Sequence, residues 1–256
     1  MLSLTATTQP REVLVQLSLL PVGVKFETDS TFKDGTDLKR IALGDDGNSY
    51  AMKRVIDHPT MPICEWVGYH FCRELMIATP EFTVLQYRDG EGPPAFGSKI
   101  ASTSQIEEDP GSIAVSNYFH GHTVALSRTY ALDAFLINPD RHARNFLMTK
   151  PPVGPATLQA FDFSRAWLRT GEPFGNEECM RDSRTQQWWK VFKRSQSCSV
   201  DQPTLDRIAA MGEAWLADVL SGCPIEWKTG FNEAAVLDFW AKRRNIRLQW
   251  AALWLT

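Results

Sequence analysis

The most informative part of the sequence is Asn138-Pro-Asp-Arg-His-Ala-Arg-Asn145, followed after a short interval by Phe161-Asp-Phe-Ser164. Together these segments set out an aspartate, Asp140, an asparagine five positions later and a second aspartate, Asp162. A carboxylate can receive a proton, and amide and carboxylate oxygens are ligands of hard cations. The spacing therefore predicts a catalytic carboxylate beside a site for a divalent metal ion.

The residues between Asn145 and Asp162 predict a hairpin. Two short apolar strands, 146–148 and 158–161, flank Pro151-Pro-Val-Gly-Pro, whose residues favour a turn. Such a hairpin brings Asn145, which precedes the first strand, close to Asp162, which follows the second. The two predicted metal ligands then share one end of the hairpin.

A helix is expected immediately before Asp140. Ser127 can cap its start, and its apolar face consists of Tyr130, Ala131, Ala134, Phe135 and Ile137. Asn138-Pro139 ends the helix, because a residue that precedes proline is pushed out of the α region. Asp140 is therefore expected on a loop directly after a buried helix, held by the packing of that helix.

Phosphotransferases of the protein-kinase type use the set formed by Asp140, Asn145 and Asp162. In these enzymes one carboxylate receives the proton of the attacking hydroxyl, while the asparagine and the second aspartate hold the Mg²⁺ ions that clamp ATP. ATP and Mg²⁺ are therefore the expected ligands. The N-terminal part of the chain should then supply a lysine for the phosphates.

Lys53 meets that requirement. It lies in Tyr50–Val55, the second strand of a hairpin predicted around the turn residues 44–49. On an extended strand Met52 and Arg54 face the opposite way, so that Lys53 can point into a cleft beneath the sheet. A solvent-facing strand lysine is the plain alternative, and the downstream Asp/Asn/Asp set favours the catalytic interpretation.

A kinase lysine needs a carboxylate partner, which a helix of the small lobe normally provides. Apolar residues that recur at spacings of three and four predict a helix at about 64–77, and Pro62 suits its entry. Glu65 and Glu74 are the rival partners on this helix. Glu65 is preferred, because Glu74 lies late in the helix beside Arg73, as a solvated surface residue does.

The chain divides into two parts. Strand-like stretches surround the single helix in the first part, and they are Val13–Leu20, Gly23–Glu27, Leu38–Leu43, Tyr50–Val55, Phe82–Tyr87 and Phe96–Ile100. Helical periodicity follows, with one apolar stripe from Leu205 to Val219 and a last helix capped by Asn232. This order predicts an α+β, bilobal, protein-kinase-like fold, with a small antiparallel-sheet N-lobe at 1–103 and a mainly helical C-lobe at 104–256.

Composition favours one catalytic unit in a reducing, cytoplasmic setting. The 256 residues are 43 % hydrophobic, enough for one large domain or two lobes that share a cleft. A net charge of −3 gives no basic field for nucleic acid, and the basic residues 242–247 are interpreted as a solvated helix face.

Five cysteines without a Cys-x-x-Cys motif, no secretory leader and no long apolar run argue against export and against a membrane. His120-Gly-His122 is interpreted as loop packing rather than as a metal site.

The motifs resemble those of the HipA-like kinases, bacterial proteins that include serine/threonine kinase toxins of persistence modules. The resemblance rests on Asn138-Pro-Asp-Arg-His-Ala-Arg-Asn145 with the later Phe161-Asp162, and it spans roughly Lys39 to Phe163. It implies transfer of phosphate from ATP to Ser or Thr of a protein or of the chain itself. It also implies an antitoxin or regulatory protein as a partner.

The resemblance implies a role for each motif residue. Lys53 would contact the α- and β-phosphates and be held by Glu65, and Asp140 would be the catalytic base. Asn145 and Asp162 would bind Mg²⁺. His142 and Arg144 would stabilise the loop or approach the transferring phosphate.

The sequence departs from ordinary protein kinases at two places. No Gly-x-Gly-x-x-Gly precedes Lys53. HipA-like kinases often have a serine-containing loop there, sometimes a site of inhibitory autophosphorylation, for which the candidates are Ser30, Thr31 and Thr36. Ser164 replaces the glycine of Asp-Phe-Gly, which keeps the metal-binding aspartate but puts the usual activation-loop switch in doubt.

Three classes of function stay open from the sequence. The first is an active kinase that acts on a protein. The second is a kinase for a lipid headgroup or another small molecule, against which the lack of a basic membrane-facing stripe argues. The third is a pseudokinase that uses the fold for docking, against which the complete Lys/Glu/Asp/Asn/Asp set argues.

Overall fold

The structure of the protein is a computed structural model. It describes residues 20–29, 40–88, 90, 92–100, 113–150, 153–171 and 173–256. The candidate phosphorylation sites Ser30, Thr31 and Thr36, most of the strand expected at 13–20, and the expected boundary between the lobes at 103/104 lie outside these residues.

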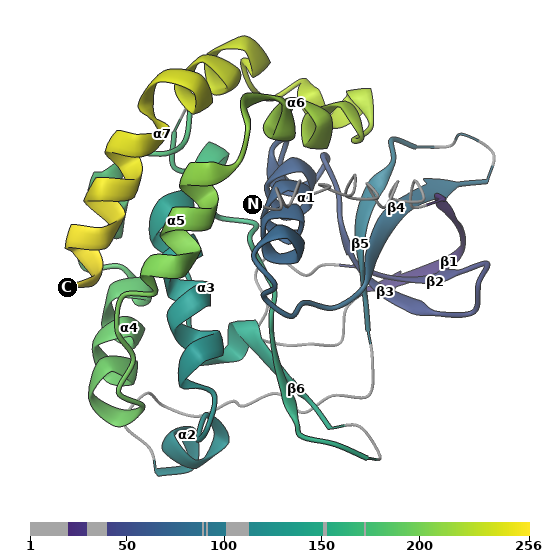
Figure 1. Cartoon of the computed structure of the whole chain (residues 1–256). Helices are drawn as coiled ribbons and strands as arrows, with labels where there is room; N and C mark the ends of the chain where they lie inside the picture. Colours follow the sequence, from purple (N-terminus) through teal and green to yellow (C-terminus); the bar gives the residue numbers. More distant parts are fainter. Residues whose placement is uncertain are drawn as a thin grey trace, which may run out of the picture.

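The first part of the chain forms a small closed barrel, seen on the right of Figure 1. Its strands are β1 (Val22–Asp29), β2 (Arg40–Gly44), β3 (Ser49–Lys53), β4 (Phe82–Tyr87) and β5 (Ala95–Lys99). They follow the order β1-β2-β3-β5-β4, and β1 also pairs with β4. The predicted strands in the described residues are confirmed to within three residues at their ends.

The structure differs from the expected antiparallel sheet, because the strands close into a barrel through one parallel pair. The β1–β4 pair is parallel, while the other pairs are antiparallel. Closure pairs the two edge strands with each other, which satisfies backbone groups that an open sheet leaves exposed. Tyr50, Met52 and Leu85 are among the buried residues that fill the interior. A pattern of alternating residues predicts strands but does not state which edges meet.

Helix α1 (Met61–Glu74) lies between the barrel and the helices of the second part (Figure 1). It begins a turn earlier than the sequence indicates, with Pro62 in its first turn, where the missing N–H costs nothing. Almost every residue up to Cys72 is buried, because α1 packs on both sides. A Cβ on Gly68 would lie 2.4 Å from Cγ of Phe163, so glycine permits this close approach.

The second part is mainly helical, with one small hairpin. Its helices are α2 (Ile113–Tyr118), α3 (Thr123–Leu136), α4 (Arg184–Ser195), α5 (Gln202–Ala210), α6 (Glu213–Ser221) and α7 (Glu233–Leu255). The hairpin strands are β6 (Phe146–Thr149) and β7 (Thr157–Ala160), as predicted. Single 3₁₀ turns occupy Ala143–Asn145 (η1), Trp167–Arg169 (η2), Glu177–Met180 (η3) and Ile225–Lys228 (η4). One continuous apolar core joins α1 to these helices.

Helix α3 differs from the prediction at both ends. It starts at Thr123, so Ser127 is an interior residue, and its buried hydroxyl accepts the backbone N–H of Ser199. It ends at Leu136, two residues before Asn138, because Ile137 takes a left-handed conformation (φ 51°). The side chain of Asn138 donates to Asp133 at 2.8 Å and holds this unusual end in place.

Two further expectations are corrected in the last helices. The apolar stripe from Leu205 to Val219 is two helices, α5 and α6, because the chain turns at Gly212. The basic residues of α7 are not all solvated. Arg247 is buried and donates to the carbonyls of Phe135, Phe174 and Gly175, so burial of its guanidinium is matched by acceptors from distant segments. Asn232 caps α7 as predicted.

No helix within the described part of the chain is both long enough and apolar enough to cross a membrane.

Candidate active site

The β6–β7 hairpin brings Asn145 and Asp162 together. Asn145 precedes β6 and Asp162 follows β7, and the backbone N–H of Phe161 donates to the carbonyl of Asn145 at 3.1 Å. The side-chain amide of Asn145 donates to Oδ2 of Asp162 at 3.3 Å. Asp162 has a left-handed backbone (φ 64°), which aspartate tolerates better than most residues. The sequence spacing thus yields a pair of oxygen-bearing side chains at one end of the hairpin.

Lys53 reaches this pair from the barrel. Its ammonium lies 3.4 Å from Oδ1 of Asp162 and 3.8 Å from Oε1 of Glu65, and its side chain is 8 % exposed. Glu65 on α1 is buried, whereas Glu74 is exposed at the end of that helix. The structure therefore places Glu65, and not Glu74, beside Lys53.

Ser164 joins the two carboxylates, which the sequence did not reveal. Its hydroxyl lies 2.6 Å from Oε1 of Glu65 and 2.7 Å from Oδ1 of Asp162. The backbone N–H of Phe163 donates to the other oxygen of Glu65 at 2.9 Å. The only sequence signal was the unusual serine after Asp-Phe. It identifies a residue that ties α1 to the segment carrying Asp162.

The two carboxyl groups have opposite pKa shifts. Burial raises the pKa of Glu65, and attraction to the Lys53 ammonium offsets this only in part. Burial also acts to raise the pKa of Asp162, but Lys53 and the Ser164 hydroxyl outweigh it and hold the pKa below its usual value. Asp162 is therefore a carboxylate at neutral pH, as a metal ligand has to be.

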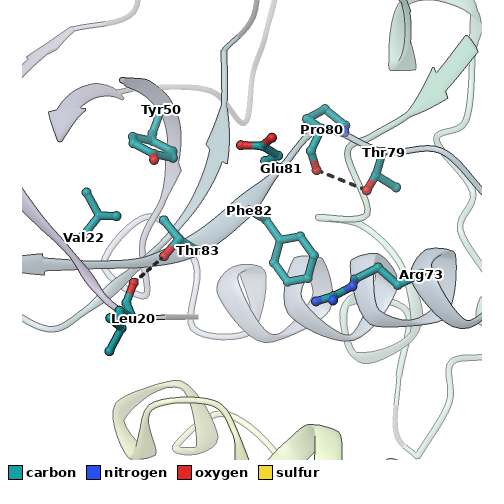
Figure 2. A pocket seen from close by; sticks show the side chains of 9 residues that line it. All are labelled: Leu20, Val22, Tyr50, Arg73, Thr79, Pro80, Glu81, Phe82 and Thr83. Carbon is teal, nitrogen blue, oxygen red and sulfur yellow. Dashed lines mark hydrogen bonds between the residues drawn. The ribbon is translucent and has the colours of Figure 1, made fainter. Parts of the chain in front are cut away.

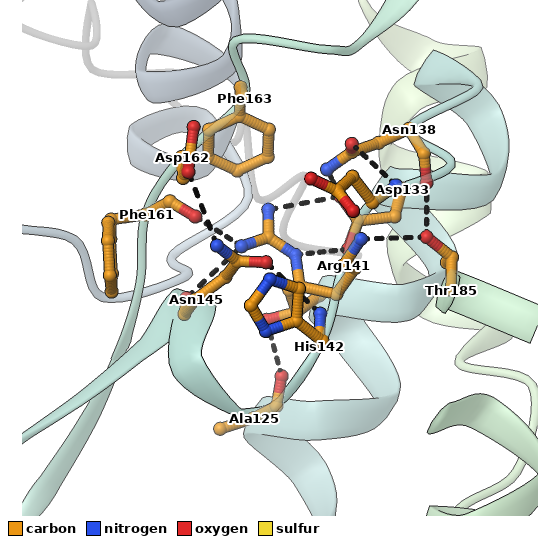
Figure 3. Close-up of polar contacts among 12 residues, drawn as sticks. Ala125, Asp133, Asn138, Arg141, His142, Asn145, Phe161, Asp162, Phe163 and Thr185 are labelled. Carbon is orange, nitrogen blue, oxygen red and sulfur yellow. Dashed lines mark hydrogen bonds and ion pairs between the residues drawn. The ribbon is translucent and has the colours of Figure 1, made fainter. Parts of the chain in front are cut away.

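A buried arginine organises the loop that carries Asp140 and Asn145. Figure 3 shows the guanidinium of Arg141 between Asp133 and the backbone of Phe161. Arg141 forms a two-point ion pair with Asp133, with Nε–Oδ2 at 2.7 Å and Nη2–Oδ1 at 3.1 Å. Its Nη1 donates to the carbonyls of Asn145 and Phe161. One side chain thus connects α3 to the residues that precede and follow the hairpin, at their shared end.

The ion pair of Arg141 and Asp133 is enclosed by the protein. The side chains of Arg141 and Asp133 are both fully buried. The guanidinium carbon lies 4.7 Å from the ring centroid of Phe163 and 5.5 Å from that of Phe146, both favourable cation–π distances. Asp133 could not have been selected from the sequence, because an aspartate within an apolar helix gives no indication of its partner.

His142 stabilises the η1 turn. The ring Nδ1 of His142 accepts the backbone N–H of Arg144 at 3.2 Å, and the backbone N–H of His142 donates to Oδ1 of Asn145 at 3.1 Å. Burial, together with the nearby cations Arg184 and Arg141, lowers the pKa of His142 to about 4. A neutral ring is the form that can accept at Nδ1. These contacts support the first of the two expected roles of His142, stabilisation of the loop. The half-buried Arg144 contributes the backbone N–H of this cap.

Asp140 lies between two arginines that the sequence did not single out. Nη1 of Arg184 is 3.3 Å from its Oδ1, and Nε of Arg165 is 3.4 Å from its Oδ2. The Asp140 side chain is 22 % exposed. The carboxylate is therefore accessible from solvent, and each of its oxygens faces a guanidinium.

A separate hollow of about 470 Å³ lies on the barrel near the end of α1. Figure 2 shows its lining, in which Arg73 projects toward Phe82 and the hydroxyl of Thr83 donates to the carbonyl of Leu20. None of the seven predicted site residues lines it. The predicted site residues therefore lie outside this hollow, and they are identified by the contacts between their side chains.

The donor set fits Mg²⁺ with nucleotide phosphates. Within the described residues, no group of three or more His, Cys, Asp or Glu side chains is arranged to hold a metal ion. Mg²⁺ is usually held in proteins by one or two carboxylates together with substrate phosphates and water. Asp162 supplies such a carboxylate, and Lys53 supplies a cation for the phosphates. Asn145 presents its amide nitrogen to Asp162 while its amide oxygen accepts the backbone N–H of His142, so Asn145 would have to turn its amide to bind the metal ion.

Comparisons with known proteins show a kinase-like fold. No family model matches the chain, and no curated protein sequence matches it. The structure is similar to that of the proinflammatory kinase CtkA of Helicobacter pylori, with 10 % identity and a TM-score of 0.50, over 92 % of this chain and 98 % of that one. A structure of WaaP in complex with acyl carrier protein matches with 16 % identity and a TM-score of 0.38, over 81 % of this chain and 84 % of that one. The likeness to CtkA shows the fold, and it does not point to the HipA-like family in particular.

Proposed function

We propose that this chain is an ATP- and Mg²⁺-dependent kinase that transfers the γ-phosphate to a hydroxyl, most simply of Ser or Thr in a protein. The observation that carries the proposal is the convergence of Lys53, Glu65, Asn145 and Asp162 within hydrogen-bond or ion-pair range. These residues come from barrel, helix and hairpin, so their meeting is not a result of sequence proximity. The kinase-like fold supports the proposal.

Each residue then has a physical task. Lys53, oriented by Glu65, neutralises phosphate charge, and Asn145 and Asp162 hold Mg²⁺, which supplies further charge neutralisation on the phosphates when bound. Asp140 receives the proton of the attacking hydroxyl. The acceptor oxygen forms a bond to the γ-phosphorus while the bond from that phosphorus to the leaving oxygen of ADP breaks. The protein contributes mainly position and charge, which is what phosphoryl transfer requires.

The nature of the acceptor rests on the motif. The resemblance to HipA-like kinases around Asn138–Asn145 supports a protein Ser or Thr as acceptor, and a partner protein such as an antitoxin. A lipid or small-molecule acceptor is the first alternative. A docking role without transfer is the second, and one observation favours it: both oxygens of Asp140 are paired with arginines.

The test is transfer of labelled γ-phosphate from Mg·ATP to the protein itself and to a bacterial lysate. Wild type is compared with Asp140→Ala and with the matched control Asp206→Ala, which removes an exposed carboxylate from α5. We expect Asp140→Ala to lower the rate by about 10²–10⁴-fold, the usual contribution of a general base. Asp206→Ala should retain the wild-type rate.

Two results would redirect the proposal. Equal labelling by wild type and Asp140→Ala would remove Asp140 as the base. ATP binding without any transfer to protein, lysate or lipid would favour the docking role.

A further inference from the structure

The two arginines that flank Asp140 form a cationic cluster at the place where an acceptor has to arrive. We define this acceptor cluster as Arg165, Arg184 and Asp140. The Asp140 side chain is 22 % exposed, that of Arg165 37 % and that of Arg184 64 %. The cluster therefore opens to solvent on its arginine side.

The position of Arg184 is not explained by helix stability. It is the first residue of α4, directly after the cap Ser183. A cation at a helix N-terminus is disfavoured by the helix dipole, which places partial positive charge there. An ion pair this exposed also contributes little to folding. Since neither effect favours an arginine here, the residue calls for a functional explanation.

Any acceptor hydroxyl has to come close to both guanidinium groups. A general base works within about 2.6–3.2 Å of the proton-bearing oxygen. Because Arg165 and Arg184 lie 3.4 and 3.3 Å from the two oxygens of Asp140, groups adjacent to the acceptor hydroxyl meet them directly. Guanidinium groups match carboxylates in geometry and in charge. The acceptor side of this site thus favours negative charge.

We propose that Arg165 and Arg184 select a Ser or Thr that is flanked by Asp or Glu in an acidic protein segment. This inference rests on the proposed kinase function. Without an acceptor the arginines pair with Asp140. When an acidic segment binds, its carboxylates replace Asp140 as partners of the arginines, and Asp140 is left to receive the hydroxyl proton. A discrete acidic segment fits better than an anionic membrane, because two arginines around one carboxylate form a small cationic site and not an extended basic surface.

The test uses three peptide sets that each present one Ser or Thr, flanked by Asp and Glu, by Ala and Gln, or by Lys. The full chain with Mg·ATP is assayed for kcat/KM on each set, at low and at high salt. We expect the acidic set to exceed the neutral set by about ten-fold, which corresponds to two favourable charge contacts near a solvent-exposed site. High salt should narrow the difference.

Substitutions then assign the preference to the cluster. In Arg165→Gln/Arg184→Gln the ratio of acidic to neutral rates should fall to near one. Arg184→Gln alone should lower this ratio in part. This single variant is the test to use if the double variant folds poorly. Arg181→Ala is the matched control, because Arg181 is an exposed arginine close in sequence that pairs with Glu178 and not with Asp140. It should keep the full preference.

The outcomes separate this inference from the kinase proposal. Equal rates on all three sets, or a preference that survives the double substitution, would overturn the inference and leave a kinase. Asp140-dependent ATP turnover with label only on anionic vesicles or on sugar phosphates would also overturn it, since the acceptor is then not a protein segment. Absence of any Asp140-dependent turnover would instead overturn the kinase function on which the inference rests.

Discussion

Two charged clusters, each in contact with Phe163, are built in opposite ways. In the Asp133–Arg141 cluster one cation meets one carboxylate at 2.7 Å, and both side chains are fully buried. In the Lys53–Glu65–Asp162 cluster one ammonium faces two carboxylates at 3.8 and 3.4 Å, and the Asp162 side chain is 26 % exposed. The first cluster is balanced in charge and closed. The second holds two carboxyl groups for one cation and has an opening.

The difference indicates that the Asp133–Arg141 cluster is a scaffold, which supports the structure, and that the Lys53–Glu65–Asp162 cluster is suited to bind a ligand. A buried ion pair that is closed to solvent and extensively hydrogen-bonded holds its neighbours in place but offers nothing to a ligand. A cluster with more carboxylates than cations suits a further cation, which we propose to be Mg²⁺. The scaffold donates to the carbonyls of Asn145 and Phe161, so it positions the site without belonging to it.

Breaking the scaffold should have the largest effect. We expect Arg141→Met to lower the free energy of unfolding by about 3–5 kcal/mol, because Asp133 is left buried without its partner. Urea unfolding measures this directly. The exposed pair Arg181–Glu178 provides the control, since Arg181→Ala should change stability by less than about 0.5 kcal/mol. If Arg141→Met lowered the free energy of unfolding by less than about 1 kcal/mol, the Arg141–Asp133 pair would not be a support of the fold.

Removing the proposed metal ligand Asp162 should affect the fold little and the site strongly. Outer-shell changes alone typically lower metal affinity 10–100-fold, so Asp162→Ala should lower Mg²⁺-dependent ATP affinity by about 100-fold or more. Stability should fall by only about 1 kcal/mol, because the loss of a like-charged neighbour of Glu65 offsets part of the cost of alanine in the left-handed conformation. Calorimetric titration of ATP with and without Mg²⁺ gives the affinity, and Asp206→Ala is the control. An unchanged Mg²⁺ dependence would exclude Asp162 from the site.

Ser164 allows a finer test of the open cluster. Its hydroxyl contacts both Glu65 and Asp162, so Ser164→Ala should loosen the orientation of Asp162 and raise the KM for Mg·ATP by about ten-fold. Ser164→Gly, which restores the residue of ordinary protein kinases, should do the same. Ser221→Ala removes a serine whose hydroxyl donates to a local carbonyl in α6 and should leave the KM unchanged. Wild-type KM in both Ser164 variants would show that the hydroxyl positions nothing.

The smallest expected effect concerns pH and the neutral ring of His142. Its pKa of about 4 in the folded protein lies below the usual value, so the unfolded chain binds the proton first as the pH falls. Its contribution to stability is full above pH 6.5 and is lost as the pH falls toward 4. The loss between pH 7 and 6 should be under about 1 kcal/mol, since one proton accounts for at most 1.4 kcal/mol per pH unit.

His142→Asn keeps a cap acceptor but does not titrate. Unfolding curves at several pH values should therefore show wild type losing stability relative to this variant below pH 6.5. A constant difference over that range would mean that His142 keeps its usual pKa in the folded protein.

Much of the site followed from spacing along the chain. The hairpin after Asn145 could be predicted because turn residues and short apolar strands are local signals. Lys53 was recognised from its place on a strand, and Glu65 was preferred over Glu74 from its place on a helix. The residues that the sequence analysis missed depend instead on contacts between distant segments. Arg165 and Arg184 face Asp140 from segments 25 and 44 residues away, and no local pattern links them.

The sequence by itself determined the strands of the described residues, the helices that precede the two motifs, and the chemical types: which oxygens and cations are available. Periodicity and turn preference act over a few residues, so they can be read from one segment at a time. Only the tertiary structure decided the closed barrel, the burial of Arg141 and Arg247, and the sharing of Ser164 between two carboxylates. These features depend on which distant groups satisfy a buried charge or hydrogen bond, and that pairing is settled by packing of the whole chain.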